Sequence, residues 1–106
     1  MSPTPPSLSQ EQRVAASQLA VANRRRRAEV KRLVKTGELS LEALFSLAEN
    51  EECVAQMRAF DLISALPAIG EVKARRIMQD AAIAQTRRVR GLGPKQRAEL
   101  FRALGR

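Results

Sequence analysis

Apolar residues recur along this chain with helical spacing and nowhere alternate with polar residues as they would in a strand. The longest predicted helix begins after Ser9, because Gln12 follows three residues later as in a capping box, and it ends at Gly37. The stretch between has no Gly or Pro, which predicts a helix of about 27 residues, roughly 40 Å long. Only its second apolar group, around Val30 and Val34, adjoins the rest of the fold. We therefore expect the first half to project or to lie across the surface.

Shorter amphipathic helices are predicted for the middle of the chain. Ser40 is placed to cap a helix that runs to about Asn50. The apolar residues of this helix follow i, i+3, i+4, i+7 spacing and form the clearest core stripe: Leu41, Leu44, Phe45 and Ala48. A short helix is predicted near residues 53–57, and Asp61 is placed to cap another that ends at Leu66.

The last third of the chain predicts two more helices. Pro67 and Gly70 break the helical pattern, and residues 71–82 then have the spacing of an amphipathic helix. Gly93 and Pro94 open the final helix, because proline suits the first helical position. The apolar face of that helix is formed by Leu100, Phe101 and Leu104. The predicted fold class is all-α, with a long N-terminal helix followed by a compact bundle of short helices.

Charge and composition divide the chain further. Residues 1–8 hold three prolines and little apolar surface, which predicts a disordered tail before a single all-helical domain over residues 9–106. The chain has 19 Lys and Arg against 11 Asp and Glu, a net charge of +8. Residues 1–37 carry eight basic and two acidic residues. Residues 38–66 carry one basic and six acidic residues, and residues 67–106 carry ten basic and three acidic residues. A basic long helix (9–37) and a basic C-terminal region therefore flank acidic linker helices.

This charge balance narrows the class of ligand. A strongly basic small domain favours a polyanion, and because Arg outnumbers Lys, nucleic acid is favoured over a membrane surface. Three Phe with no Trp or Tyr argue against a base-stacking platform for single strands, so a duplex is the better substrate. No run approaches the roughly 18 apolar residues of a membrane-spanning helix, and the early prolines make a poor signal peptide. We expect a cytoplasmic protein.

Metal, disulfide and cofactor sites are not indicated by the sequence. Cys53 is the single cysteine and the chain has no His, which excludes a disulfide and a Cys/His zinc site. We expect Cys53 to be a small buried apolar residue. Glu49, Glu51 and Glu52 are interpreted as solvated carboxylates rather than metal ligands. A chain of 106 residues leaves little room for a catalytic cavity with its own lid, so no enzymatic activity is predicted.

Two glycine-containing turns, at residues 66–74 and 90–96, carry the candidate chemistry. Each joins an apolar residue to a helix start with a lysine, so each is expected to present unpaired backbone N–H groups and a cation together, which suits phosphate. In the first turn Ala74 follows Gly70 by four residues, as in helix-hairpin-helix elements that grip one DNA strand. The first glycine usual in such elements is replaced here by Ala68.

Arginines next to the second turn are further candidates. Arg87, Arg88 and Arg90 stand directly before Gly91 and Gly93, where a loop can present guanidinium groups to a groove or to phosphates. Positive charge is added nearby by Lys73, Arg75 and Lys95. The long helix contains four consecutive arginines, namely Arg24, Arg25, Arg26 and Arg27. Because these four cover every side of a helix, at least one must face the body, and nucleic-acid contact and solvated surface both remain open for them.

A family resemblance is carried by residues 66–74, 77–78, 86–93 and 96–97, together with the Glu11-Gln12-Arg13 opening. These segments resemble the signature of the actinobacterial integration host factor family. The resemblance implies a helix-two-turn-helix region over residues 66–104. It also implies a nucleoid-associated protein that binds double-stranded DNA with little sequence preference, bends it and assists site-specific recombination, with recombinase complexes on DNA as further partners.

By position, the resemblance also implies which residues contact DNA. The family's basic loop falls on the three arginines before the second turn, and its DNA-contacting turn falls on Ile69, Gly70, Glu71, Val72 and Lys73. Glu71 is an acid where a base would serve phosphate binding, so its side chain is expected to turn away while its backbone N–H donates. No heptad seam is sustained through the long helix, which favours a monomer.

Two other functions compete with this interpretation. The similar small-subunit ribosomal protein has the same two-turn arrangement, so binding of ribosomal RNA is the alternative, although this chain lacks that family's long basic C-terminal tail. A repair glycosylase or lyase would use Lys73 as an amine nucleophile. After Asp80 the only acid is Glu99, which is predicted to lie on the last helix away from the turn, and no second domain can receive a flipped base. Catalysis is therefore disfavoured.

Overall fold

The structure is a computed structural model, and it describes residues 9–105 of the chain. The predicted tail, residues 1–8, lies outside the described residues. Within them the chain forms helices without a named strand, so the all-α fold class is confirmed. The elements in order are α1 (Gln10–Thr36), α2 (Leu41–Asn50), α3 (Glu52–Ala55), α4 (Ala59–Ala65), α5 (Gly70–Asp80), the 3-10 turn η1 (Val89–Gly91) and α6 (Pro94–Ala103).

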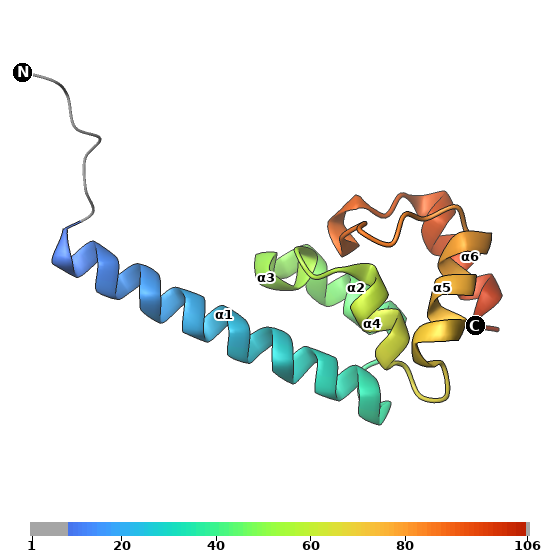
Figure 1. Cartoon of the computed structure of the whole chain (residues 1–106), viewed down its shortest axis with the longest axis horizontal. Coiled ribbons are helices and arrows are strands. Elements are labelled where there is room, and N and C mark those ends of the chain that lie inside the picture. The colour runs from blue at the N-terminus through green and yellow to red at the C-terminus, as the bar shows by residue number, and fades with distance from the viewer. Residues whose placement is uncertain (1–8, 106) are drawn as a thin grey trace, which may run out of the picture.

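Helix α1 has the predicted length and ends. The Ser9 hydroxyl accepts from the Gln12 N–H at 3.1 Å, and the Gln12 side chain accepts from the Ser9 N–H at 2.9 Å. Gly37 ends the helix with φ +82°, a left-handed conformation that glycine adopts without strain. Figure 1 shows the N-terminal half of α1 extending away from the other helices, and residues 10–20 are all exposed. Of the two arrangements that the sequence left open, the structure therefore shows the projecting one.

The core lies between the C-terminal half of α1 and the shorter helices. Val30 and Val34 are fully buried where α1 meets α3 and α4, and α4 packs along α5. The predicted stripe of α2 turns inward, and the Phe45 ring meets the Phe101 ring of α6 edge to face with centroids 5.7 Å apart. Cys53 was expected to be buried, but it is half-buried at the edge of this core.

Pairing between two distant loops explains where α4 begins. The sequence predicts a start at Asp61, but α4 begins at Ala59 and Asp61 lies in its first turn. Residues 58 and 88 form an isolated antiparallel bridge, in which the Ala59 N–H donates to the Arg87 carbonyl at 3.0 Å. The same bridge places the Val89 N–H 2.9 Å from the Met57 carbonyl. This tertiary contact occupies the helix start in place of a side-chain cap.

Two further helix boundaries differ slightly from the expectation. Helix α3 covers Glu52–Ala55 rather than residues 53–57, because the chain turns into the bridge at Met57. Helix α5 ends at Asp80, since Ala82 takes a left-handed φ of +57° and the Ile83 N–H donates back to the Met78 carbonyl at 2.8 Å. This is the hydrogen-bond pattern of a Schellman C-cap, with alanine where glycine is usual.

Candidate nucleic-acid interface

The turn between α4 and α5 presents unoccupied backbone donors. Ile69 donates its N–H to the Leu66 carbonyl at 3.1 Å, whereas the N–H groups of Gly70, Glu71 and Val72 donate to no acceptor within residues 9–105. All three residues are exposed. Gly70 has φ +72°, and a Cβ built there would meet no atom within 4 Å, so the backbone at this point is open to a ligand.

Side chains at the start of α5 add both charge and apolar surface to this turn. Lys73 Nζ lies 3.5 Å from the Ala68 carbonyl, which keeps its ammonium group beside the free amides. The Arg75 guanidinium lies over the Phe60 ring, 5.8 Å from its centroid. Glu71 is exposed in the first helical turn, where an acid suits the helix dipole. Val72 is 80% exposed, more than any other large apolar residue within residues 9–105.

The second turn differs from the first, because its amides are already used within the protein. Gly91 donates its N–H to the Arg88 carbonyl at 2.9 Å, and Leu92 donates to the Val89 carbonyl at 3.2 Å. The Gly93 N–H donates to the Gln96 side-chain oxygen at 3.1 Å, and Pro94 has no N–H. The first unoccupied donor therefore belongs to Lys95. The expectation of free amides at both turns is correct for the first and wrong for Gly91 and Gly93.

The two turns are also separate in space. Figure 1 shows the α4–α5 turn at the lower edge of the body and residues 87–93 at its upper edge, beyond the opposite end of α5. Helix α5 has 11 residues, which corresponds to a length of roughly 16 Å. A single phosphate cannot be shared between the two turns, so they form two regions of surface.

The arginines before the second turn are held against α3. Arg88 donates from Nη1 to the Gln56 carbonyl at 2.6 Å, and Arg90 forms an ion pair with Glu52. Arg87 folds over Gly91 and lies 3.4 Å from its carbonyl oxygen. All three arginines are exposed, so the loop presents cations to solvent while the bridge at residues 58 and 88 holds its backbone in place.

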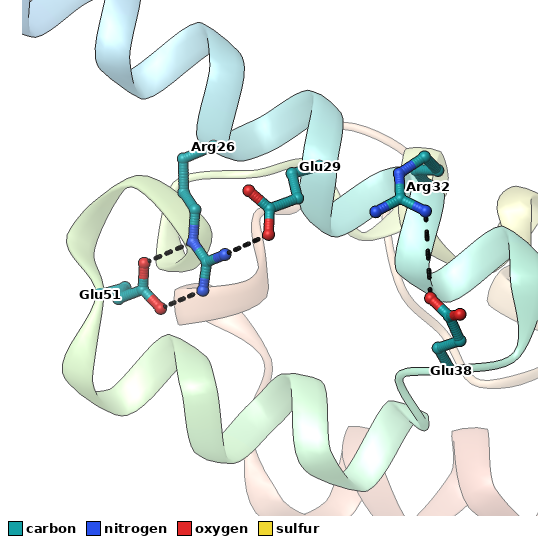
Figure 2. A network of polar contacts seen from close by, with 5 residues as sticks. All are labelled: Arg26, Glu29, Arg32, Glu38 and Glu51. Atoms are coloured by element: carbon teal, nitrogen blue, oxygen red, sulfur yellow. Dashed lines mark hydrogen bonds and ion pairs between the residues drawn. The ribbon is translucent and has the colours of Figure 1, made fainter.

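The four consecutive arginines of α1 have different surroundings. Arg26 makes a bidentate pair with Glu51, with both N–O distances 2.8 Å, and also contacts Glu29 at 3.2 Å, as Figure 2 shows. The hydrogen bond from Arg26 lowers the pKa of Glu51 below its ordinary value, and the same bond raises the pKa of Arg26. Arg24 and Arg25 are exposed, whereas Arg27 is half-buried. Arg26 is therefore the member that anchors α1 to the body.

A basic hollow lies between α1, α4 and the loop that carries Arg87, Arg88 and Arg90, which we call the arginine loop. Some of its lining residues were not singled out from the sequence. It has a volume of about 400 Å³ and is lined by Arg27, Lys31, Arg58 and Arg88, with Asp61 as its acid. Lys31 and Arg58 were missed by the sequence analysis. Arg58 is the only base within residues 38–66, and that isolation was the one signal available for it.

No group of three His, Cys, Asp or Glu side chains is arranged to hold a metal ion within residues 9–105. None of the described helices combines the length and the apolar character needed to cross a membrane.

Comparisons with known proteins agree on one family. Residues 34–104 match the model of the S13-like H2TH domain. The chain is 45% identical over 100 residues to the integration host factor of Mycobacterium tuberculosis, covering 94% of this chain and 95% of the relative. It is 46% identical over 96 residues to that of Mycolicibacterium smegmatis, with 91% of each covered, and 41% identical over 100 residues to that of Streptomyces coelicolor, with 94% of each covered.

A solved structure is similar as well. It is described as sIHF bound to an 8-bp palindromic DNA, and it superposes on this chain with a TM-score of 0.76 at 39% sequence identity. The match covers 80% of this chain and 96% of that one.

Proposed function

The chain belongs to the integration host factor family with its S13-like H2TH domain, and on this premise we propose that it is an architectural DNA-binding protein of the nucleoid. It binds double-stranded DNA with little sequence preference through the sugar-phosphate backbone and the minor groove. The observation that carries the proposal is the row of unoccupied N–H groups at Gly70, Glu71 and Val72. Backbone donors of this kind recognise phosphate oxygens, which are the same at every base pair.

The arginine loop supplies the second attachment. Arg87, Arg88 and Arg90 are exposed guanidinium groups on a backbone fixed by the 58–88 bridge, and such groups suit a narrow minor groove. The loop and the α4–α5 turn lie beyond opposite ends of α5, and we propose that a duplex bends toward the protein to contact both. The proposal includes bending, compaction and assistance to a site-specific recombinase, and it is supported by the two separate contact regions and by the similarity to integration host factors.

A salt titration of duplex binding tests the proposal. Fluorescence anisotropy with two unrelated duplexes of equal length should give similar affinities at each salt concentration. If six to eight cations neutralise phosphates, log K against log salt should fall with a slope of about −5 to −7. An affinity that does not respond to salt, or a large preference for one of the two sequences, would overturn the proposal.

A glycine variant tests the turn itself. Gly70→Ala adds a Cβ at the free amides and places it at φ +72°, so both strain and lost backbone approach are expected. Gly37→Ala is the control for backbone strain, because Gly37 has a similar φ of +82° but already donates its N–H to the Val34 carbonyl, and its added Cβ would make only an ordinary van der Waals contact with Pro67, at 3.7 Å. Both variants should lose about 1 kcal/mol of stability, and only Gly70→Ala should weaken DNA binding at a temperature where both are folded. Equal binding by the two variants would contradict the role of the turn.

Duplex RNA is the second candidate ligand, because the matched domain is described as S13-like. An A-form duplex has a wide, shallow minor groove, and the arginine loop would meet it less closely than it meets B-form DNA. Competition between DNA and RNA duplexes of equal length and sequence decides between the two. We expect DNA to displace RNA, and the reverse order would favour the RNA-binding function.

A further inference from the structure

The basic hollow brings together cations from three separate segments. Arg27 and Lys31 come from α1, Arg58 from the residue before α4, and Arg88 from the loop before η1. Arg27 and Lys31 are four residues apart and therefore share one face of their helix. The hollow of about 400 Å³ also contains the Asp61 side chain, so its lining has four positive charges and one negative charge.

The cations of the hollow form no ion pair within residues 9–105, whereas four arginines elsewhere do. Ion pairs within residues 9–105 engage Arg26, Arg32, Arg90 and Arg102, each with one or more glutamates. No ion pair in this part of the chain involves the four cations of the hollow, and Arg88 donates only to the neutral Gln56 carbonyl. Four like charges with a single acid among them repel one another, and a bound anion reduces that cost.

The hollow is held in shape by the fold. The bridge between residues 58 and 88 fixes the backbone of two of its cations through hydrogen bonds of 2.9 and 3.0 Å. The other side is placed by α1, whose buried Val30 and Val34 and whose Arg26–Glu51 pair attach it to the body, as Figure 2 shows for the pair. The four cations therefore surround a defined space rather than moving independently on the surface.

We infer that this hollow is a phosphate-binding part of the DNA interface, an assignment that rests on the proposed function and gives α1 a role in it. The hollow lies at the N-terminal end of α4, and the turn with free amides lies at its C-terminal end. Helix α4 has seven residues, roughly 10 Å, which corresponds to about three nucleotides at 3.4 Å per strand. One duplex can therefore reach both regions.

Charge-neutralising variants with matched controls test the inference. Lys31→Gln and Lys35→Gln remove the same charge from exposed lysines one turn apart on α1, but only Lys31 lines the hollow. Lys31→Gln should make the salt slope of duplex binding less steep by about one unit, and Lys35→Gln should leave it unchanged. Arg58→Gln should act like Lys31→Gln, with Arg102→Gln as its control on α6.

A triple variant strengthens the experiment. Substituting Arg27, Lys31 and Arg58 together by Gln should remove about three units of salt slope. Circular dichroism and thermal unfolding establish that the variants remain folded before binding is measured. Equal salt slopes for Lys31→Gln and Lys35→Gln, with a steep salt slope for the unsubstituted protein, would contradict phosphate binding by the hollow and leave the proposed function intact. A shallow slope for the unsubstituted protein would overturn the proposed function itself.

Discussion

At the scale of single residues, the α4–α5 turn needs left-handed backbone at two positions and has glycine at only one. Gly70 adopts φ +72° without strain, whereas Ala68 adopts φ +66° with a Cβ. The left-handed conformation costs roughly 1–2 kcal/mol for an L-residue. Ala68 stands where helix-hairpin-helix elements usually have their first glycine, and it adopts a left-handed φ although it carries a Cβ.

Ala68→Gly should therefore stabilise the protein. Relief of the strained φ outweighs the extra unfolded-state entropy of glycine, and the expected gain in free energy of unfolding is about 1 kcal/mol. Urea unfolding monitored by circular dichroism measures it. Ala98→Gly, on the exposed surface of α6, is the control and should lose about 1 kcal/mol. A loss of stability in both variants would show that Ala68 is not strained.

Glu52 is the residue that competes with DNA for Arg90. The two side chains form an ion pair and remain 62% and 58% exposed, so a phosphate that approaches Arg90 must displace the carboxylate. Glu52→Gln should raise duplex affinity and steepen the salt slope by up to about one unit, because Arg90 becomes available. Anisotropy titrations at several salt concentrations provide the measurement.

Glu49→Gln is the matched control for that prediction. Glu49 and Glu52 line the same shallow surface beside Arg90, but Glu49 forms no ion pair within residues 9–105. Its substitution changes the net charge equally and should change affinity less. A lower affinity of Glu52→Gln would mean that Glu52 positions Arg90 for DNA rather than competing with it.

At the scale of elements, the sequence predicts what is decided locally. The capping box at Ser9, the cap at Ser40 and the Gly93-Pro94 start each depend on residues within four positions, and all three are confirmed. The predicted start of α4 at Asp61 was wrong, because the helix start is determined by the bridge between residues 58 and 88, which are 30 positions apart in the sequence. No periodicity of a single segment contains that information.

In the candidate site, too, the features that depend on neighbouring residues were predictable, whereas those that depend on other parts of the structure were not. The free amides of the first turn were predictable, since a glycine before a helix start leaves them without local acceptors. The occupied amides of the second turn were not, because they depend on the 3-10 turn at residues 89–91 and on the Gln96 side chain. Likewise, four consecutive arginines indicated that one must face the body, but only the position of Glu51 identifies it as Arg26.

The Arg26–Glu51 pair makes the attachment of α1 sensitive to acid. The pKa of Glu51 lies below its ordinary value near 4.5, chiefly because of the hydrogen bond from Arg26. A lowered folded-state pKa contributes stability above the unfolded-state pKa, and this contribution is lost as the pH falls through the folded-state value. Glu51→Gln should cost about 0.5–1 kcal/mol at pH 7 and progressively less as the pH falls below about 4.5.

Thermal unfolding from pH 7 to pH 2.5 measures this dependence. Glu49→Gln is the control, because it removes a glutamate two positions away that forms no ion pair within residues 9–105 and leaves the Arg26–Glu51 pair in place. If Glu51→Gln and the unsubstituted protein differed by the same amount at every pH, the pair would not be the source of the acid sensitivity.

At the scale of the whole molecule, net charge predicted the class of ligand but not the surface that meets it. Four arginines are paired with glutamates within the described residues, whereas the four cations that line the hollow form no ion pair there. The acidic segment 38–66 contributes Glu38, Glu51 and Glu52 to those pairs. Its glutamates therefore pair with Arg26, which anchors α1, and with Arg32 and Arg90, which remain exposed.

Two separated regions on one molecule predict additive losses of binding. Arg58→Gln affects the hollow and Gly70→Ala affects the turn, at opposite ends of α4, roughly 10 Å apart. Changes at this separation without shared partners add within about 0.3–0.5 kcal/mol. On a duplex of about 20 bp, the double variant should therefore lose the product of the two fold-changes in affinity. The pair Lys31→Gln and Arg58→Gln, which neutralises two cations of one hollow, should depart from additivity. A double variant of Arg58 and Gly70 that binds no more weakly than either single variant would mean that DNA occupies only one region at a time.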